Sequence, residues 1–287
     1  MTEAAHTGWQ RLAIIAGGGE VPLLIAQGEK GAGRSPFIVE VTGFADQDYS
    51  AYDRSAFPVT KIGGMQKAMR EAGCDAVCFI GRITRPDFKS LMGLDTAAMT
   101  LLPKITQAAR YGDDALMRVI IDSFENKGLR AIGADQALSS LVPEAGTLGA
   151  IQPDAAAMAD IEKALSIARA IGAHDIGQGA VVANGLVLAV EAQEGTDRML
   201  ARVAELPDDI RGRAEGRLGV LAKTPKPQQE RRIDLPTIGL HTIDGVSRAG
   251  LAGIAIHAGN ALIPRMDETI AAADAAGIFI YAARADE

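Results

Sequence analysis

The stretch Leu12-Ala-Ile-Ile-Ala-Gly-Gly-Gly19 decides the fold class of the first half of the chain. Its five apolar residues predict a buried strand, and its three glycines predict a tight turn. Residues 21–30 follow with a helical pattern and carry Pro22 in the first turn, where proline is tolerated. A buried strand, a tight turn and a helix in this order predict the first strand–helix unit of a parallel sheet.

The same alternation continues through the rest of the first half. Further strands are predicted at 37–41, 76–80 and 128–132, and helices at 64–71, 96–109 and 114–126. Short apolar strands separated by helices predict a parallel sheet that is covered on both faces, as in a Rossmann-like α/β domain.

A change in composition separates two domains. Residues 142–153 show little periodicity and contain two prolines and two glycines, which predicts an interdomain linker. We therefore expect an N-terminal Rossmann-like domain over 8–141 and a C-terminal domain over 154–287.

The second half of the chain has a different order of predicted strands and helices. Asp154 is a predicted cap for a long alanine-rich helix, and Asn184-Gly185 predicts a type I′ turn in a hairpin of residues 180–190. Other strands are predicted at 218–222, 253–256 and 278–281, and helices at 195–205, 242–249 and 266–276. Strands joined by both turns and helices predict a mixed α/β domain.

The composition narrows the class of protein. The chain has 287 residues, 48% of them hydrophobic, so it can bury sizeable cores, and its net charge of -7 argues against a nucleic-acid scaffold. Its N-terminus shows no signal peptide, and no stretch reaches the roughly 18 apolar residues that span a bilayer. Cys74 and Cys78 are expected to be reduced, structural thiols. We expect a cytoplasmic protein.

Two glycine- and arginine-containing turns are candidate phosphate sites. Gly17, Gly18 and Gly19 precede a helix, whose N-terminal amides attract phosphate. Pro22 stands where a dinucleotide fingerprint has its third glycine, so that motif is incomplete. Arg82 and Arg85 follow the strand at 76–80, at the sheet edge where α/β proteins bind ligands. The alternatives are a plain tight turn and a solvated loop.

Carboxylates gather at the start of two helices. Asp113 lies at the start of one of them. It is a candidate substrate-binding residue, and the alternative is that it only caps the helix. Glu191, Glu194 and Asp197 lie within seven residues between a strand and the other helix. Mg²⁺ prefers oxygen ligands and would neutralise such a group, whereas the alternative is an acid-rich helix N-terminus that the helix dipole favours.

The polar segment 223–236 carries both signs of charge. Lys223, Lys226 and Arg232 are candidates for holding a diphosphate, and Glu230 and Asp234 for holding a metal or activating water. A solvated charged loop is the alternative. The four histidines lack zinc-ligand spacing and no G-x-S-x-G elbow is present, so activated water is favoured over a covalent serine.

Several short motifs, taken in order, resemble one family. They are Ile14-Ile-Ala-Gly-Gly-Gly19, Gly177-Gln178, Ala189-Val-Glu191, Glu194-Gly-Thr-Asp-Arg-Met-Leu200, Lys226-Pro227 and Asp234-Leu-Pro-Thr-Ile-Gly239. In this order and spacing they resemble the LpxI-type UDP-2,3-diacylglucosamine pyrophosphatases, and the likeness covers nearly the whole chain.

The resemblance implies a reaction of lipid A (lipopolysaccharide) biosynthesis. The family hydrolyses a UDP-sugar lipid to UMP and 2,3-diacylglucosamine 1-phosphate (lipid X), with water attacking the lipid-side phosphorus. It implies two α/β domains with the ligand between them, and metal assistance by Mg²⁺ or Mn²⁺. The site residues that follow are catalytic Asp234, Glu230, Asp197 and Glu194; metal ligands Glu191, Asp197 and Asp234; and, besides the phosphate candidates above, substrate-binding Gln178, Thr196 and Thr237.

One position departs from the family pattern. The family usually has Asp where this chain has Glu230, which places the carboxylate one methylene further out. Asp234 is therefore an equal candidate for activating water.

Other functions fit parts of the sequence. A nicotinamide-dependent oxidoreductase is suggested by the glycine turn, and a non-catalytic lipid or nucleotide carrier needs a pocket but no carboxylate cluster. An apolar stretch at 91–102 is either ordinary core or a slot for acyl chains. We expect a small lipid-nucleotide ligand, possible peripheral contact with the inner membrane, no nucleic acid, and a homodimer on base rates.

Overall fold

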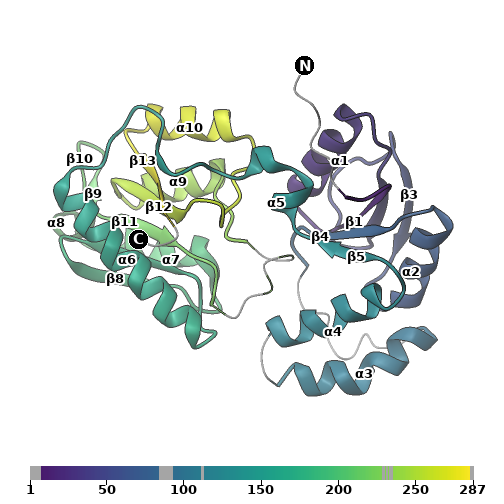
Figure 1. The fold of residues 1–287 in the computed structure, drawn as a ribbon. Coiled ribbons are helices and arrows are strands. Elements are labelled where there is room, and N and C mark those ends of the chain that lie inside the picture. The colour runs from purple at the N-terminus through teal and green to yellow at the C-terminus, as the bar shows by residue number, and fades with distance from the viewer. Residues whose placement is uncertain are drawn as a thin grey trace. The chain divides into compact units, whose positions relative to one another are not determined.

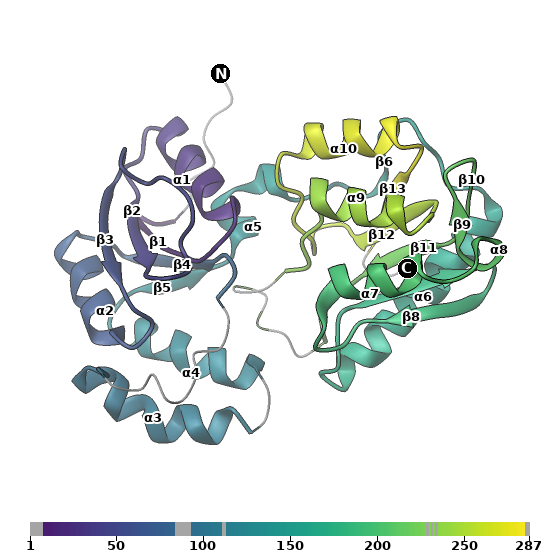
Figure 2. The same ribbon diagram turned by 180° about the vertical axis from the view of Figure 1, so that it is seen from behind.

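The computed structural model describes residues 8–83, 93–110, 113–227, 230, 232 and 235–284. The chain forms two compact units that divide between Ser139 and Ser140. A short segment that holds Glu230 and Arg232 groups with the first unit, although the chain on either side of it belongs to the second. The prediction had placed that segment in the C-terminal domain. Figures 1 and 2 show the helices and strands of both units from opposite sides.

The first unit is built on a five-stranded parallel sheet in the order β3-β2-β1-β4-β5. Its strands are β1 (Leu12–Ala16), β2 (Phe37–Val41), β3 (Asp53–Phe57), β4 (Ala76–Ile80) and β5 (Arg130–Ile132). Its helices are α1 (Val21–Gly31), α2 (Ile62–Glu71), α3 (Thr96–Ala108), α4 (Asp113–Glu125) and α5 (Ala134–Ala137). The parallel sheet predicted for the N-terminal domain is confirmed.

Helices cover this sheet on both faces, with α1 and α5 on the opposite side from α2 and α4 (Figure 1). On the second of these faces, buried residues of β1, β2 and β4 pack against α2 and α4. The rings of Phe79 and Phe124 meet edge to face, with their centroids 5.1 Å apart. Within the apolar stretch at 91–102, Leu94 and Leu101 pack against this core, whereas Met99 is 62% exposed.

The second unit contains a six-stranded mixed sheet in the order β6-β13-β12-β11-β7-β8. Strands β11, β12 and β13 are parallel to one another, and β6 and β7 flank them antiparallel. The strands are β6 (Gly146–Leu148), β7 (Gly179–Ala183), β8 (Leu186–Val190), β11 (Val220–Lys223), β12 (Gly253–His257) and β13 (Phe279–Ala283). Strands β9 (Gly212–Arg213) and β10 (Gly216–Arg217) form a separate ribbon. The predicted mixed α/β fold is confirmed.

Two different cores lie on the two faces of this sheet. Its helices are α6 (Ala155–Ala173), α7 (Gly195–Ala204), α8 (Asp208–Arg211), α9 (Leu240–Arg248) and α10 (Met266–Ala275). Val181, Leu221 and Ile254 face the core beneath α7 and α9, whereas Val182 and Val220 face α6. Successive residues of a strand therefore face opposite cores, so the face of one residue determines the face of the next.

Two strands of the main sheets escaped the sequence-based prediction, as did the two-residue strands β9 and β10 of the small ribbon. Strand β6 lies inside the predicted linker and pairs with β13. It is short and bounded by glycines, so it shows no alternation. Strand β3 is an edge strand with the polar sequence Asp-Arg-Ser-Ala-Phe and mostly exposed residues. An edge strand that is exposed to water does not need the apolar run by which buried strands are recognised.

Two smaller expectations can be compared with the structure. Cys74 and Cys78 are buried and form no disulfide, as predicted. Burial raises the pKa of the Cys78 thiol to about 12. No helix among the described residues combines the length and apolar character needed to cross a membrane.

The β7–β8 hairpin confirms the predicted Asn-Gly turn. Asn184 and Gly185 both have positive φ angles, of 50° and 74°, as a type I′ turn requires. The carboxylate of Asp160 on α6 accepts the amide of Asn184 at 2.8 Å and the amide of Gly185 at 2.7 Å. Because Asp160 is buried, these bonds tie the turn to the long helix.

We predict that Asp160→Ala destabilises the second unit, because it leaves two turn amides without their acceptor. The expected loss in free energy of unfolding is about 1–3 kcal/mol. Urea unfolding checks this, with Glu162→Ala on the exposed side of the same helix as the control, expected to cost less than about 0.5 kcal/mol. Equal losses in the two variants would contradict this role for Asp160.

Candidate functional site

The first candidate site lies where the strand order of unit 1 reverses, between β1 and β4. The turns that follow these strands are paired: Gly18 N–H donates to Arg82 O at 3.0 Å, and Arg82 N–H to Gly18 O at 2.8 Å. A Cβ on Gly17 would lie 2.8 Å from the backbone of Gly81. Only glycine lets the two turns approach this closely.

The glycine amides already have acceptors within the protein. Gly17 N–H donates to Ile80 O and Gly18 N–H to Arg82 O, while Gly19 N–H donates to the Asp46 carboxylate at 2.9 Å. Hydrogen bonds from the Gln47 side chain and from Gly19 lower the pKa of Asp46. A substrate phosphate at this turn would have to replace Asp46 or bind through Arg82, which is exposed.

Two of the predicted phosphate and substrate contacts are not positioned. Arg85 lies outside the described residues. Asp113 is the first residue of α4, as expected, but the placement of its side chain is also outside the description. Their roles stay predictions.

The second candidate site is built around Glu191 in unit 2. Its side chain is only 6% exposed, although it follows a strand and precedes the start of a helix. Thr196 Oγ1 donates to Glu191 Oε1 at 3.0 Å, while Oε2 is buried without a hydrogen-bond partner. A Cβ on Gly179 would lie 2.7 Å from Oε2, so the missing side chain of Gly179 provides the space that this carboxylate occupies.

Lys223 lies on the same face of the sheet. It is the last residue of β11 and pairs with Gly179 of β7, and Glu191 N–H donates to Gly179 O from the other side. Residues paired across strands share a face, so Glu191 and Lys223 flank Gly179 on the side of α7 and α9. Lys223 is 7% exposed, and its amine donates to Thr237 O at 3.1 Å. The structure thus gathers Glu191, Thr196, Lys223 and Thr237.

The other acids of the predicted cluster lie at the start of α7, with Glu194 at the N-cap position and Asp197 in the first turn. Glu194 is bonded to the Arg202 guanidinium at 2.5 Å, and hydrogen bonding to backbone amide groups and to Arg202 lowers its pKa. Asp197 is 67% exposed and lies 3.3 Å from His241 Nε2. Both residues thus have partners other than Glu191, and a catalytic role for them stays a prediction.

The described carboxylates do not form a metal centre by themselves. Within the described ranges, no three His, Cys, Asp or Glu side chains come together as a metal-binding group. Of the predicted ligands, Glu191 offers a buried oxygen without a partner, Asp197 is exposed, and Asp234 lies outside the described residues. A metal at Glu191 would need its other ligands from parts of the chain that are not described, or from substrate and water.

Glu230 and Arg232 form a tight pair in unit 1. Arg232 donates through Nε to Glu230 Oε1 at 2.8 Å and through Nη2 to Oε2 at 3.0 Å. This two-pronged bond lowers the pKa of Glu230 and raises that of Arg232. Arg232 Nη1 also donates to Glu125 Oε1 at 2.7 Å. Arg232 thus holds two carboxylates, and Glu230 is a weak proton acceptor.

Two further predicted contacts differ in whether the protein supplies them with a partner. Lys226 Nζ lies 2.5 Å from the Asp175 carboxylate, and Gln178 Oε1 is a buried oxygen without a hydrogen bond. Gln178 directly precedes β7, and its backbone O accepts the amide of Thr224 at 3.0 Å. The roles of Lys226 and Gln178 in substrate binding stay predictions.

Two residues of these sites were missed from the sequence. Asp46 accepts a hydrogen bond from the Gly19 amide, and Gly179 makes room for Glu191. Asp46 is distant in sequence from Gly19 and carried no local signal. The alternating glycines Gly177 and Gly179 at the start of a strand were a usable signal, because glycine in a strand often marks the close approach of another group.

Comparisons with known proteins place the whole chain in one family. The model of the LpxI N-terminal domain matches residues 11–141, and that of the LpxI C-terminal domain matches residues 144–281. The chain is also 51% identical over 271 residues to a protein of Caulobacter vibrioides named UDP-2,3-diacylglucosamine pyrophosphatase LpxI. That match covers 94% of this chain and 96% of the relative. Both halves are matched in order, and this chain belongs to the LpxI family.

Proposed function

We propose that this protein is a hydrolase that cleaves UDP-2,3-diacylglucosamine to UMP and 2,3-diacylglucosamine 1-phosphate, in lipid A biosynthesis. The main support is the Caulobacter vibrioides relative of that name, which is 51% identical over nearly the full length of both chains. The buried Glu191 and Lys223 supply the two signs of charge that such a reaction uses. An oxidoreductase is disfavoured, because Pro22 replaces the third fingerprint glycine and Asp46 occupies the Gly19 amide.

The proposed reaction is a phosphoryl transfer to water. Water attacks the lipid-side phosphorus, the bond from that phosphorus to the bridging oxygen breaks, and UMP leaves with the bridging oxygen. Negative charge increases on the bridging oxygen as this bond breaks. The protein must therefore supply cations near the diphosphate and a group that takes a proton from water.

Lys223 is the described cation best suited to hold the diphosphate. Its ammonium is buried at the carboxyl end of β11, the end at which open α/β sheets bind ligands. A cation in a site that excludes water interacts more strongly with phosphate than one in solvent. Thr237 O accepts from this ammonium, and Thr196 Oγ1 holds Glu191 beside it.

A divalent cation is part of the proposal. Glu191 Oε2, buried and without a hydrogen bond, is the described oxygen that would bind Mg²⁺ or Mn²⁺. When bound, such a cation neutralises phosphate charge and lowers the pKa of a coordinated water. Thr196 would orient the carboxylate by keeping its other oxygen occupied.

We assign proton transfer from water to Asp234 rather than Glu230. Both oxygens of Glu230 accept from Arg232, and its lowered pKa makes it a poor base. Asp234 lies outside the described residues, and the support for it is this exclusion together with its place in the Asp234-Leu-Pro-Thr-Ile-Gly239 motif. Arg232 and Glu125 then serve to hold the segment that leads to it.

The same proposal includes a cytoplasmic homodimer that meets its substrate at the inner membrane. Acyl chains of the substrate partition into a bilayer, so contact with its surface would deliver the substrate. Two-fold dimers are the commonest soluble oligomers.

We predict that the purified protein releases UMP from UDP-2,3-diacylglucosamine, and that removal of divalent cations abolishes this release. Turnover is followed with and without a chelator, and activity should return when Mg²⁺ or Mn²⁺ is added in excess. Circular dichroism of the chelated protein controls for unfolding. Turnover that survives thorough chelation would contradict the metal, and no turnover by a folded, metal-loaded sample would contradict the reaction.

We predict unequal effects at the two candidate bases. Asp234→Asn should lower kcat by at least about 10²-fold, the smaller end of the range for a lost general base. Glu230→Gln should lower kcat by less than about tenfold and leave the acidic limb of the pH profile in place, because the hydrogen bonds from Arg232 lower the pKa of Glu230 and so disfavour it as the titrating base. Glu162→Gln, at an exposed position of α6, is the control for loss of one surface charge.

The pH profile decides between the two residues. If the acidic limb disappears in Glu230→Gln, Glu230 is the titrating base and our assignment is wrong. Wild-type turnover by Asp234→Asn would also refute it.

A further inference from the structure

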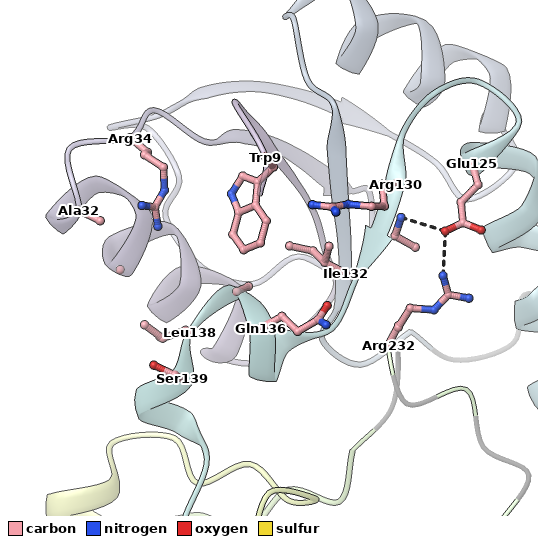
Figure 3. Close-up of a pocket in the computed structure, with 13 residues that line it drawn as sticks. Trp9, Ala32, Arg34, Glu125, Arg130, Ile132, Gln136, Leu138, Ser139 and Arg232 are labelled. Atoms are coloured by element: carbon pink, nitrogen blue, oxygen red, sulfur yellow. Dashed lines mark hydrogen bonds and ion pairs between the residues drawn. The ribbon is translucent and has the colours of Figure 1, made fainter. Parts of the chain in front are cut away.

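A cavity of about 790 Å³ opens in unit 1 beside the edge strand β5 (Figure 3). This volume lies within the range of roughly 300–1,000 Å³ that is typical of small-molecule sites. The end of α1, strand β5, helix α5 and Trp9 line it. Among the predicted substrate-binding residues, only Arg232 is part of the lining.

The Trp9 indole is held in place by a buried acid. Its Nε1 donates to Glu29 Oε2 at 3.3 Å, and Glu29 is fully buried. Arg34 binds the same carboxylate through Nε at 2.9 Å and through Nη2 at 2.6 Å. The ring is therefore oriented before any ligand arrives, and ordering it on binding costs little entropy.

Two guanidinium groups flank the indole. Figure 3 shows Trp9 between Arg34 and Arg130. Arg130 donates to Gly8 O at 2.7 Å through Nη2. In the part of the chain that the structure describes, Nη1 of Arg34 and both Nε and Nη1 of Arg130 have no acceptor, so donors remain for an anion. Glu29 neutralises one of these two cations, which leaves a net positive charge beside the ring.

The lining suits a ligand that is flat at one end and anionic at the other. An aromatic face stacks on a nucleobase, and guanidinium groups bind phosphate. Gln136 uses its oxygen to accept Gly133 N–H at 3.3 Å, so its amide NH₂ can donate to a carbonyl of a base. A bare phosphate would leave the indole uncovered, and an acyl chain would desolvate the arginines.

We propose that this cavity binds a nucleoside monophosphate, with the base on Trp9 and the phosphate on Arg34 and Arg130. The site is separate from the one at the switch point. Trp9, Arg34 and Arg130 lie at the amino ends of β1, β2 and β5, whereas Gly17–Gly19 and Arg82 follow the carboxyl ends of β1 and β4. The proposal does not depend on the proposed hydrolysis.

The chain provides its own reporter, because Trp9 is its single tryptophan. Indole emission is measured while UMP is added to the full-length protein, with free tryptophan as the control for absorbance by the nucleotide. Uridine and inorganic phosphate test the two halves of the ligand. The expected result is a saturable change with UMP and an affinity at least about tenfold weaker for either half.

Arg130→Gln tests the phosphate contact. It should weaken UMP binding by about tenfold or more while turnover is retained. Lys127→Gln is the matched control, since it removes one positive charge from an exposed position nearby that does not line the cavity. Circular dichroism confirms that both variants fold.

Three results would overturn the proposal. One is the absence of a saturable change with UMP in the folded protein. Another is equal weakening by Arg130→Gln and Lys127→Gln, which would reduce the effect to overall charge. The third is loss of turnover together with binding in Arg130→Gln, which would make the cavity part of the reaction site.

Discussion

The buried carboxylate of Glu191 occupies space that is open because Gly179 has no side chain. A Cβ at that position would lie 2.7 Å from Glu191 Oε2. The glycine at the start of β7 therefore determines whether the carboxylate that follows β8 fits in its present position. A buried polar group without a partner costs about 1–3 kcal/mol, and an unpaired charge costs more. Such a group persists where it serves a ligand or a neighbouring charge, and Lys223 lies on the same face of the sheet.

The rest of unit 2 positions this pair. Strand β11 runs parallel to β12 and β13, and Lys223 at its carboxyl end donates a hydrogen bond to Thr237 O. The core under α7 and α9 fixes that face of the sheet. Unit 1 uses glycine for a different purpose, since Gly17 and Gly81 let two turns meet by backbone contact and the amides are consumed in doing so. Glycine-rich turns that are similar in sequence can thus differ in how many backbone amides remain to donate hydrogen bonds to a ligand.

The sequence predicted the two-domain α/β fold because buried strands and amphipathic helices leave a local pattern. It missed β3 and β6, which are an exposed edge strand and a short strand between glycines, and the two-residue strands β9 and β10. In the candidate site it identified Glu191, Thr196, Lys223 and Thr237, which the structure brings together. It also grouped Glu194 and Asp197 with Glu191. In the structure Glu194 pairs with Arg202 and Asp197 lies 3.3 Å from His241 Nε2, so that grouping stays a prediction. The contacts of Asp46 with Gly19 and of Glu125 with Arg232 could not be predicted, since nothing local specifies a contact across many residues.

The measurement that tests the central claim most directly is the kcat of Gly179→Ala on UDP-2,3-diacylglucosamine. The added methyl group meets the end of a flexible side chain, so it should displace the Glu191 carboxylate while the protein stays folded. Gly216→Ala, in the β9–β10 ribbon with open space around the new Cβ, is the matched control. We predict that kcat falls at least about 10²-fold in Gly179→Ala and is unchanged in the control. Wild-type turnover by folded Gly179→Ala would show that the buried carboxylate is not part of the reaction site.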